Sequence, residues 1–160
     1  MGVPGLAPLA RDDGESMDLN DLLADPRVVW TEDVLRFGDT DANGHINNAL
    51  FATLCESGRV NLFRTRFDPT LPKNRFFVIA RLGIDFRAEL NFPGSVRTGT
   101  WITRLGRSSV SLAQVILSGD TLAAEADAVC VLMDGATRRP MPYPDATRRA
   151  LESMLRPTAE

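Results

Sequence analysis

The sequence is poor in the residues that build metal sites, disulfide frameworks and membrane spans. It has one histidine, His45, and two cysteines, Cys55 and Cys130, which form no CxxC pair, so we expect no metal site. No apolar run approaches the ~20 residues of a transmembrane helix. The first residues lack the basic start and the apolar core of a signal peptide. We therefore expect a cytoplasmic protein that is independent of membranes and keeps its two thiols reduced.

Lysine is almost absent as well, because Lys73 is the single lysine beside seventeen arginines. The formal net charge is only −3, which disfavours a nucleic-acid binder, since such a protein needs a basic face to neutralise phosphates. The arginine excess fits two explanations that composition cannot separate. One is a GC-rich genome, and the other is a set of guanidinium forks that bind phosphate oxygens.

The length of 160 residues predicts a single domain. Residues 1–25 are rich in glycine, proline and aspartate without a sustained period, so we expect a disordered tail with at most one short turn near residues 19–23. Residues 26–156 are expected to form the folded domain.

Hydrophobic periodicity gives the order of elements within this domain. Residues 28–37 are rich in strand formers, and residues 48–67 carry an apolar stripe at three- and four-residue steps that predicts a long helix. Residues 76–88 alternate with period two, with Val78 expected on the same face as Leu82 and Phe86. Further strands are expected at residues 96–105, 109–117 and 122–133, and a short final helix capped by Asp145. One helix among consecutive strands predicts an α+β fold in which an antiparallel sheet of about five strands wraps around the long helix.

Chemical groups concentrate in one segment, residues 37–48, with the sequence FGDTDANGHINN. It lies between a predicted strand and the start of the long helix, where Asn47 or Asn48 is suited to be the N-cap. The first turn of a helix leaves N–H groups unpaired and carries about +0.5 charge, so it can stabilise an oxyanion. A carboxylate, an imidazole and such a site are sufficient for acyl transfer to water.

The motif DTDANGHINN, followed by CESGR in the helix, resembles the hotdog-fold thioesterases of the 4-hydroxybenzoyl-CoA thioesterase group. It is also similar to the catalytic half of plant acyl-ACP thioesterases, and the resemblance covers about residues 27–150. It implies a hotdog fold and hydrolysis of an acyl-CoA or acyl-ACP thioester, with no metal or organic cofactor. The resemblance places the catalytic carboxylate at Asp41, an asparagine and a histidine at Asn43 and His45, and a further acidic residue at Glu89 in IDFRAEL.

Each of these residues also has a purely structural interpretation. Asp39 is expected to bond backbone N–H groups in the turn, and Asp41 is open to the same role. Asn43 with Gly44 forms the commonest turn dipeptide, and a lone histidine is often only structural. Glu56 is expected to be an ion-pair partner on the polar side of the helix.

Two chemical routes remain open for the expected reaction. An aspartate is ionised at neutral pH and is a weak general base, but it can attack a thioester directly and form an anhydride. Histidine titrates near neutrality and is the better base for activating water. Asp41 is therefore either the nucleophile or the group that orients water for His45.

The resemblance also suggests where the thioester carrier binds. Related enzymes contact the pantetheine arm and the nucleotide phosphates at a turn corresponding to RLGRSS, which assigns Arg104, Arg107, Ser108 and Ser109 to substrate or CoA binding; a solvated basic turn is the alternative. Hotdog domains pair through edge strands, so a homodimer or homotetramer is implied. Two other functions stay open. One is an enoyl-CoA hydratase or dehydratase, because hotdog enzymes of that kind use an aspartate and a histidine in a GDxNPxH-like segment where this chain has GDTDANGH. The other is a non-catalytic acyl-CoA binding module.

Overall fold

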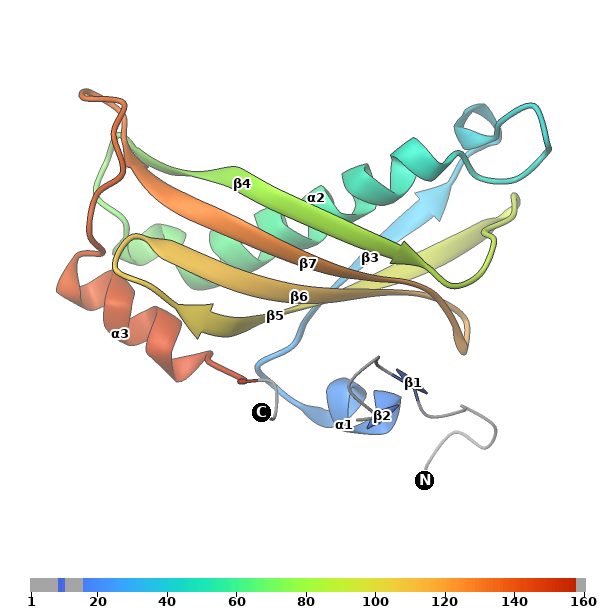
Figure 1. The fold of residues 1–160 in the computed structure, drawn as a ribbon, viewed down its shortest axis with the longest axis horizontal. Coiled ribbons are helices and arrows are strands. Elements are labelled where there is room, and N and C mark those ends of the chain that lie inside the picture. The colour runs from blue at the N-terminus through green and yellow to red at the C-terminus, as the bar shows by residue number, and fades with distance from the viewer. Residues whose placement is uncertain (1–8, 11–15, 158–160) are drawn as a thin grey trace.

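The computed structural model describes residues 9–10 and 16–157, which form a curved antiparallel sheet, a long central helix and shorter peripheral elements (Figure 1). The elements in chain order are β1 (Leu9–Ala10), β2 (Ser16–Met17), α1 (Leu19–Ala24), β3 (Val29–Leu35), η1 (Phe37–Asp39), α2 (Asn48–Arg66), η2 (Asp68–Thr70), β4 (Arg75–Phe86), β5 (Gly94–Leu105), β6 (Ser109–Ser118), β7 (Thr121–Asp134) and α3 (Asp145–Ser153). None of the described helices is long and apolar enough to cross a membrane.

The main sheet has the strand order β3-β5-β6-β7-β4, and every neighbouring pair is antiparallel. Helix α2 lies along one face of this sheet, so the predicted α+β arrangement of one helix and five strands is confirmed. Strands β3 and β4 form the two edges.

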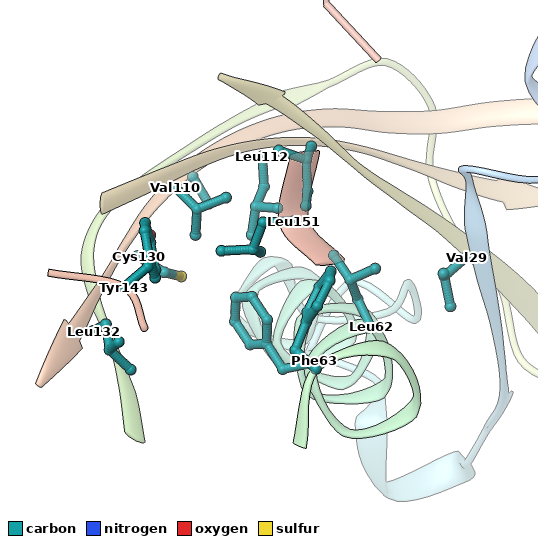
Figure 2. Packing of buried hydrophobic residues seen from close by; sticks show 12 residues of the cluster. Val29, Leu62, Phe63, Val110, Leu112, Cys130, Leu132, Tyr143 and Leu151 are labelled. Carbon is teal, nitrogen blue, oxygen red and sulfur yellow. The ribbon is translucent and has the colours of Figure 1, made fainter. Parts of the chain in front are cut away.

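Two hydrophobic clusters join α2 to the sheet. One contains Leu62 and Phe63 of α2, which point toward Val110 and Leu112 of β6 and Leu151 of α3 (Figure 2). The other lies nearer the start of α2 and includes side chains of α2, β5, β6 and β7 together with Leu35, Ile46 and Leu90. The helix therefore owes its position to burial of apolar side chains in both its first and its second half.

A polar layer lies between these clusters, where the backbone of α2 closely approaches the sheet at Gly58. Gly58 is buried there, and a Cβ atom at this position would meet Thr100 Oγ1 at 2.6 Å and Gln114 Nε2 at 2.9 Å. Gln114 is 1% exposed, accepts a hydrogen bond from the buried Arg59 and donates to Cys55 O and Thr100 Oγ1. A buried guanidinium needs a hydrogen-bond acceptor, and Gln114 supplies it for Arg59. Gln114 also binds the α2 backbone at Cys55 O, so it holds the helix against the sheet.

The expected N-terminal tail is partly folded. Residues 19–24, where the sequence predicted at most a short turn, form α1, with Leu19 and Leu22 buried beside Trp101 and Val115. Thr100 and Ile102 of β5 face α2, so Trp101 between them lies on the other face, and helix α1 covers that face. The folded region therefore begins before residue 26. The rest of the predicted tail, residues 1–8 and 11–15, lies outside the described residues.

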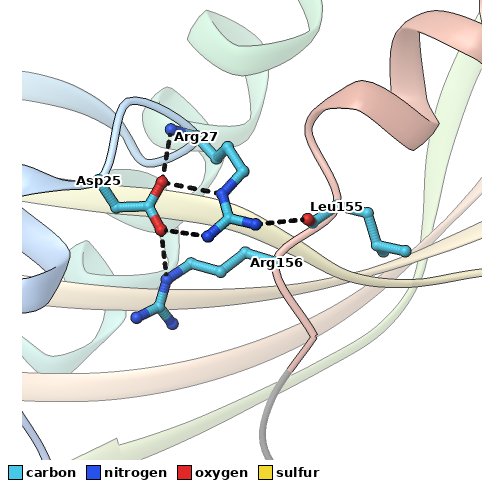
Figure 3. A network of polar contacts seen from close by, with 4 residues as sticks. All are labelled: Asp25, Arg27, Leu155 and Arg156. Carbon is cyan, nitrogen blue, oxygen red and sulfur yellow. Dashed lines mark hydrogen bonds and ion pairs between the residues drawn. The ribbon is translucent and has the colours of Figure 1, made fainter.

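A clasp of charged groups joins this N-terminal region to the C-terminal segment. The Asp25 carboxylate accepts hydrogen bonds from the Arg27 backbone and guanidinium and from Arg156 Nε at 2.8 Å (Figure 3). Arg27 also donates to Leu155 O at 3.0 Å. The hydrogen bonds from Arg27 are the main reason that the pKa of Asp25 lies well below its ordinary value.

Two local predictions were wrong. Val78 does not share a face with Leu82, because the register shifts between Ile79 and Arg81: Ile79 pairs with the buried Cys130, whereas Val78 pairs with Val131 on the other face. A bulge of this kind inserts one residue and reverses the alternation. Asp145 is the first residue of α3 and makes no capping hydrogen bond; Pro144, with its fixed φ, is the N-cap.

Candidate active site

The segment at residues 39–47 is a compact turn that ends in the first turn of α2. Asp41 Oδ1 accepts a hydrogen bond from Asn43 N at 2.8 Å, and the Asp41 backbone bonds to Gly44 N and His45 O. Gly44 has φ +82°, which a glycine adopts without strain. Asp39 accepts a hydrogen bond from Arg36 N at 2.7 Å, which confirms its predicted role in the turn.

The turn is tied to the loop that follows β4. Ile46 N donates to Leu90 O at 2.8 Å, and Asn47 N donates to Asp39 O at 2.9 Å. Ile46 and Leu90 are both buried. Residues 41–45 and 87–90 are distant in the sequence, and these contacts hold them side by side.

Together they line a pocket of about 340 Å³. Its apolar wall consists of Ile46, Phe51, Phe86 and Leu90, and its polar residues are Asp41, Asn43, His45, Asn48, Arg87 and Glu89. Phe51 and Phe86 meet edge to face with ring centroids 5.0 Å apart. A pocket with one apolar wall and a few convergent polar groups is typical of a small-molecule site.

The structure brings all four sequence-predicted catalytic residues to this pocket. His45 Nε2 lies 3.2 Å from Glu89 Oε2, so the imidazole is oriented by the carboxylate of the β4–β5 loop. A base oriented by a third group is a common arrangement in acyl transfer. Asp41 belongs to the same turn as His45 and lines the same pocket as Asn48, the first residue of α2.

Few N–H groups at the beginning of α2 are left for a ligand. The Asn47 side chain accepts from Ala49 N at 2.9 Å, which makes it the N-cap, and Leu50 N donates to Asn47 O. Within residues 16–157 the Asn48 N–H has no hydrogen-bond partner. It is thus the first-turn donor best placed to stabilise a developing oxyanion.

The residues predicted to bind CoA lie elsewhere. Arg104, Arg107, Ser108 and Ser109 are at the β5–β6 turn, at the end of the sheet opposite the pocket. The twelve residues of β5 separate the two ends by about 36 Å. In this turn Arg148 donates to Gly106 O and Tyr143 N to Arg107 O, so in a single chain these groups border α3 and not the pocket.

Sequence reasoning missed several pocket residues, namely Phe51, Phe86, Arg87 and the Asn48 backbone. The signal for Phe86 was present, because it lies three residues before Glu89 on the apolar face of a predicted strand. Arg87, which follows β4, donates a hydrogen bond from Nε to Glu125 Oε2 of β7 at 2.9 Å. The order of residues in the sequence does not reveal this contact. Among the described residues, no group of three or more His, Cys, Asp or Glu side chains is placed to hold a metal ion.

Comparison with known proteins identifies the family. Residues 35–151 match the model of the thioesterase-like superfamily, a range that spans the turn, the pocket and strands β4 to β7. The chain belongs to the thioesterase-like superfamily. No match was found among curated proteins.

Solved structures of thioesterases share the fold. A predicted thioesterase from Bacillus stearothermophilus is 29% identical, with a TM-score of 0.75 over 82% of this chain and 99% of that chain. A thioesterase from Thermus thermophilus, crystallised with coenzyme A and Zn, is 30% identical with a TM-score of 0.70, covering 80% of this chain and 94% of that chain. A DHNA-CoA thioesterase from Staphylococcus aureus, at 18% identity and TM-score 0.71 over 79% and 89% of the two chains, shares the fold. The predicted hotdog fold is thereby confirmed.

Proposed function

We propose that this thioesterase-superfamily chain hydrolyses an acyl-CoA thioester in the pocket at the start of α2, with Asp41 as the reacting carboxylate. The observation that carries the proposal is the convergence of Asp41, Asn43, His45 and Glu89 on one pocket that also has an apolar wall. Support for CoA as the carrier comes from the Thermus thermophilus relative, which was crystallised with coenzyme A.

The pocket suggests how the thioester would lie. The acyl group would contact Phe51 and Phe86, and its carbonyl oxygen would face the Asn48 N–H at the positive end of α2. An oxyanion donor of this kind contributes about a hundred- to thousand-fold in rate. Asp41 would then be positioned against the carbonyl carbon.

Two routes fit this arrangement. In the first, an Asp41 oxygen attacks the carbonyl carbon, the C–S bond breaks and the thiolate leaves, and water then opens the anhydride at the Asp41 carbonyl. In the second, water attacks the thioester directly, His45 accepts its proton, and Asp41 orients the water molecule. The 3.2 Å contact between His45 Nε2 and Glu89 Oε2 supports the second route, because a base that is oriented by a third group is the arrangement that water activation needs. Repeated turnover in ¹⁸O-water separates them: the anhydride route leaves ¹⁸O in the Asp41 carboxylate, and the water route leaves the protein unlabelled.

We further propose that the chain forms a dimer through β4. This edge strand is twelve residues long and exposes Val78, Ile79 and Phe86. The other edge, β3, is shorter, and it contacts α2 through the bond from Asn61 Nδ2 to Thr31 Oγ1. A long exposed edge with apolar side chains is a template for pairing with another strand.

The experiment that tests the proposal is thiol release from a panel of acyl-CoA substrates that differ in chain length and in aromatic character. We expect hydrolysis of at least one member. Loss of the conjugated double bond of an enoyl-CoA without thiol release would instead indicate a hydratase. Tight acyl-CoA binding with every thioester left intact would indicate a binding module.

A further inference from the structure

Two aromatic rings form the inner end of the pocket. Phe51 lies three residues after the start of α2, Phe86 ends β4, and their rings meet edge to face with centroids 5.0 Å apart. Both side chains line the pocket, whereas Cys55 and Ile84, the next residues toward the core on the two elements, do not. Phe51 is 2% exposed and Phe86 is 50% exposed, so the helix holds one ring in the core and the strand holds the other at the rim. We call Phe51 and Phe86 the aromatic gate.

An apolar strip continues beyond the gate along the face of β4 that is turned toward α2. Ile84 packs against the core cluster there but is only partly buried, and Ile79 farther along the strand is 49% exposed. The neighbouring strand carries small side chains, with Ala124 paired with Phe86 and Ala126 paired with Ile84. Because these alanines leave the space beside them to larger neighbours, removal of the Phe86 ring would join the pocket to the strip.

The gate lies close to the expected position of the thioester carbonyl. Phe51 follows Asn48, whose N–H is the proposed oxyanion donor, by three residues, or about 4.5 Å along the helix axis. An extended chain advances about 1.2 Å per bond, so an acyl chain that runs along α2 from the Asn48 N–H meets the rings after about four carbon atoms. The pocket volume of about 340 Å³ is also at the low end of the range for small-molecule sites.

We propose that the aromatic gate limits the substrate to compact acyl groups and that Phe86 determines this limit. The inference rests on the proposed function and gives the substrate class of the same site. A straight chain of about four carbon atoms, or a single aromatic ring, ends before the gate. A longer group must push the Phe86 ring away from Phe51, and the edge-to-face contact between the two rings opposes that movement.

The first test measures kcat/KM for acyl groups of two lengths in the wild type and in Phe86→Ala. Butanoyl-CoA is paired with octanoyl-CoA, and benzoyl-CoA with para-butylbenzoyl-CoA, so that the result does not depend on a preference for aliphatic or aromatic groups. A methylene that enters an apolar site raises kcat/KM by up to about fourfold. We expect the wild type to favour the shorter member about tenfold or more, and Phe86→Ala to raise the long-to-short ratio by about tenfold or more. The half-exposed position of Phe86 allows this variant to fold, which its circular dichroism spectrum checks.

The second test moves the ring instead of removing it. Phe86→Ala/Ile84→Phe places a ring two residues farther from the pocket on the same face of β4, about 7 Å along the strand. The longest acyl group that is hydrolysed efficiently should then gain about six carbon atoms relative to the wild type. A length limit that stayed at butanoyl or benzoyl would overturn the assignment to Phe86.

Two control variants isolate the gate. Phe37→Ala removes an exposed ring from another edge-to-face pair that does not line the pocket. Val78→Ala removes an exposed apolar side chain from β4 away from the pocket, and so tests for an effect of the strand on assembly. Both should leave the long-to-short ratio at the wild-type value, and a ratio that rose in either control as much as in Phe86→Ala would overturn the proposal.

The outcomes separate the length limit from the proposed function. If the wild type hydrolyses the longer member of a pair at least as well as the shorter one, or if Phe86→Ala changes both equally, the length limit is wrong while thioester hydrolysis stands. If the wild type releases thiol from none of these substrates, the proposed function itself fails.

Discussion

The close contact between α2 and the sheet at Gly58 predicts that Gly58→Ala destabilises the protein. In an exposed helix this substitution stabilises by about 1 kcal/mol, because glycine has the greater backbone entropy in the unfolded chain. Here the new Cβ would lie 2.6 Å from Thr100 Oγ1 and 2.9 Å from both Gln114 Nε2 and Thr98 Cγ2. Real Cβ atoms do not approach other heavy atoms so closely, so the helix or these buried side chains must move.

The expected net effect is destabilising. Overpacking of a core typically costs about 1–3 kcal/mol, and separating Gln114 from Thr100 adds about 1 kcal/mol for the lost hydrogen bond. After the gain in helix propensity, we expect the free energy of unfolding to fall by about 1–3 kcal/mol, or roughly 2–10 °C in Tm for a chain of this size.

Urea denaturation followed by circular dichroism measures this change. Thr53→Ala is the matched control, because Thr53 is exposed on the same helix and the substitution improves helix propensity without a new contact; it should stabilise by a few tenths of a kcal/mol. If Gly58→Ala stabilised the protein by about 1 kcal/mol, the close contact between α2 and the sheet would be refuted.

Three further predictions concern buried and charged groups. Gln114→Leu should lower the free energy of unfolding by about 3–5 kcal/mol, because it leaves the buried Arg59 guanidinium without its acceptor; an unchanged urea midpoint would contradict this. Asp25→Asn should destabilise by about 1–3 kcal/mol at neutral pH. Because arginine hydrogen bonds hold the pKa of Asp25 below its ordinary 3.8, the contribution of this carboxylate is fully present above that ordinary pKa and is lost as the pH falls below it. The difference in urea midpoint between wild type and variant should therefore narrow at pH 3, and a constant difference would refute the clasp. Burial raises the pKa of both Cys55 and Cys130 to about 11, so neither thiol should react with Ellman's reagent at pH 8 until urea unfolds the protein; rapid labelling of the native protein would be inconsistent with their burial.

Much of the fold follows from local patterns in the sequence. The apolar stripe of α2 and the alternation of the strands are strong enough to predict both element type and order. The polar layer around Gly58 was not predictable, because Arg59, Thr100 and Gln114 are brought together only by the docking of the helix. A bulge changes alternation through pairing with another strand, so the face of Val78 could not be read from its own segment.

The candidate site was also predictable from the sequence only in part. Asp41, Asn43 and His45 lie within five residues, so their proximity was predictable from the turn chemistry. Glu89 was assigned only through the family resemblance, and the bond between Ile46 and Leu90 shows how tertiary structure brings its loop to the turn. The β5–β6 turn was assigned to the same ligand, but its distance from the pocket depends on the direction of β5, which sequence order does not give.

The central claim is that the Asp41 carboxylate drives hydrolysis at the start of α2, and kcat/KM of Asp41→Asn on the best acyl-CoA substrate tests it most directly. Asp39→Asn is the matched control, because it changes a carboxylate two residues away that bonds the Arg36 backbone. With unchanged circular dichroism spectra, we expect a loss of about a hundredfold or more for Asp41→Asn and activity within a few-fold of wild type for Asp39→Asn. Full turnover by a folded Asp41→Asn protein would contradict the account.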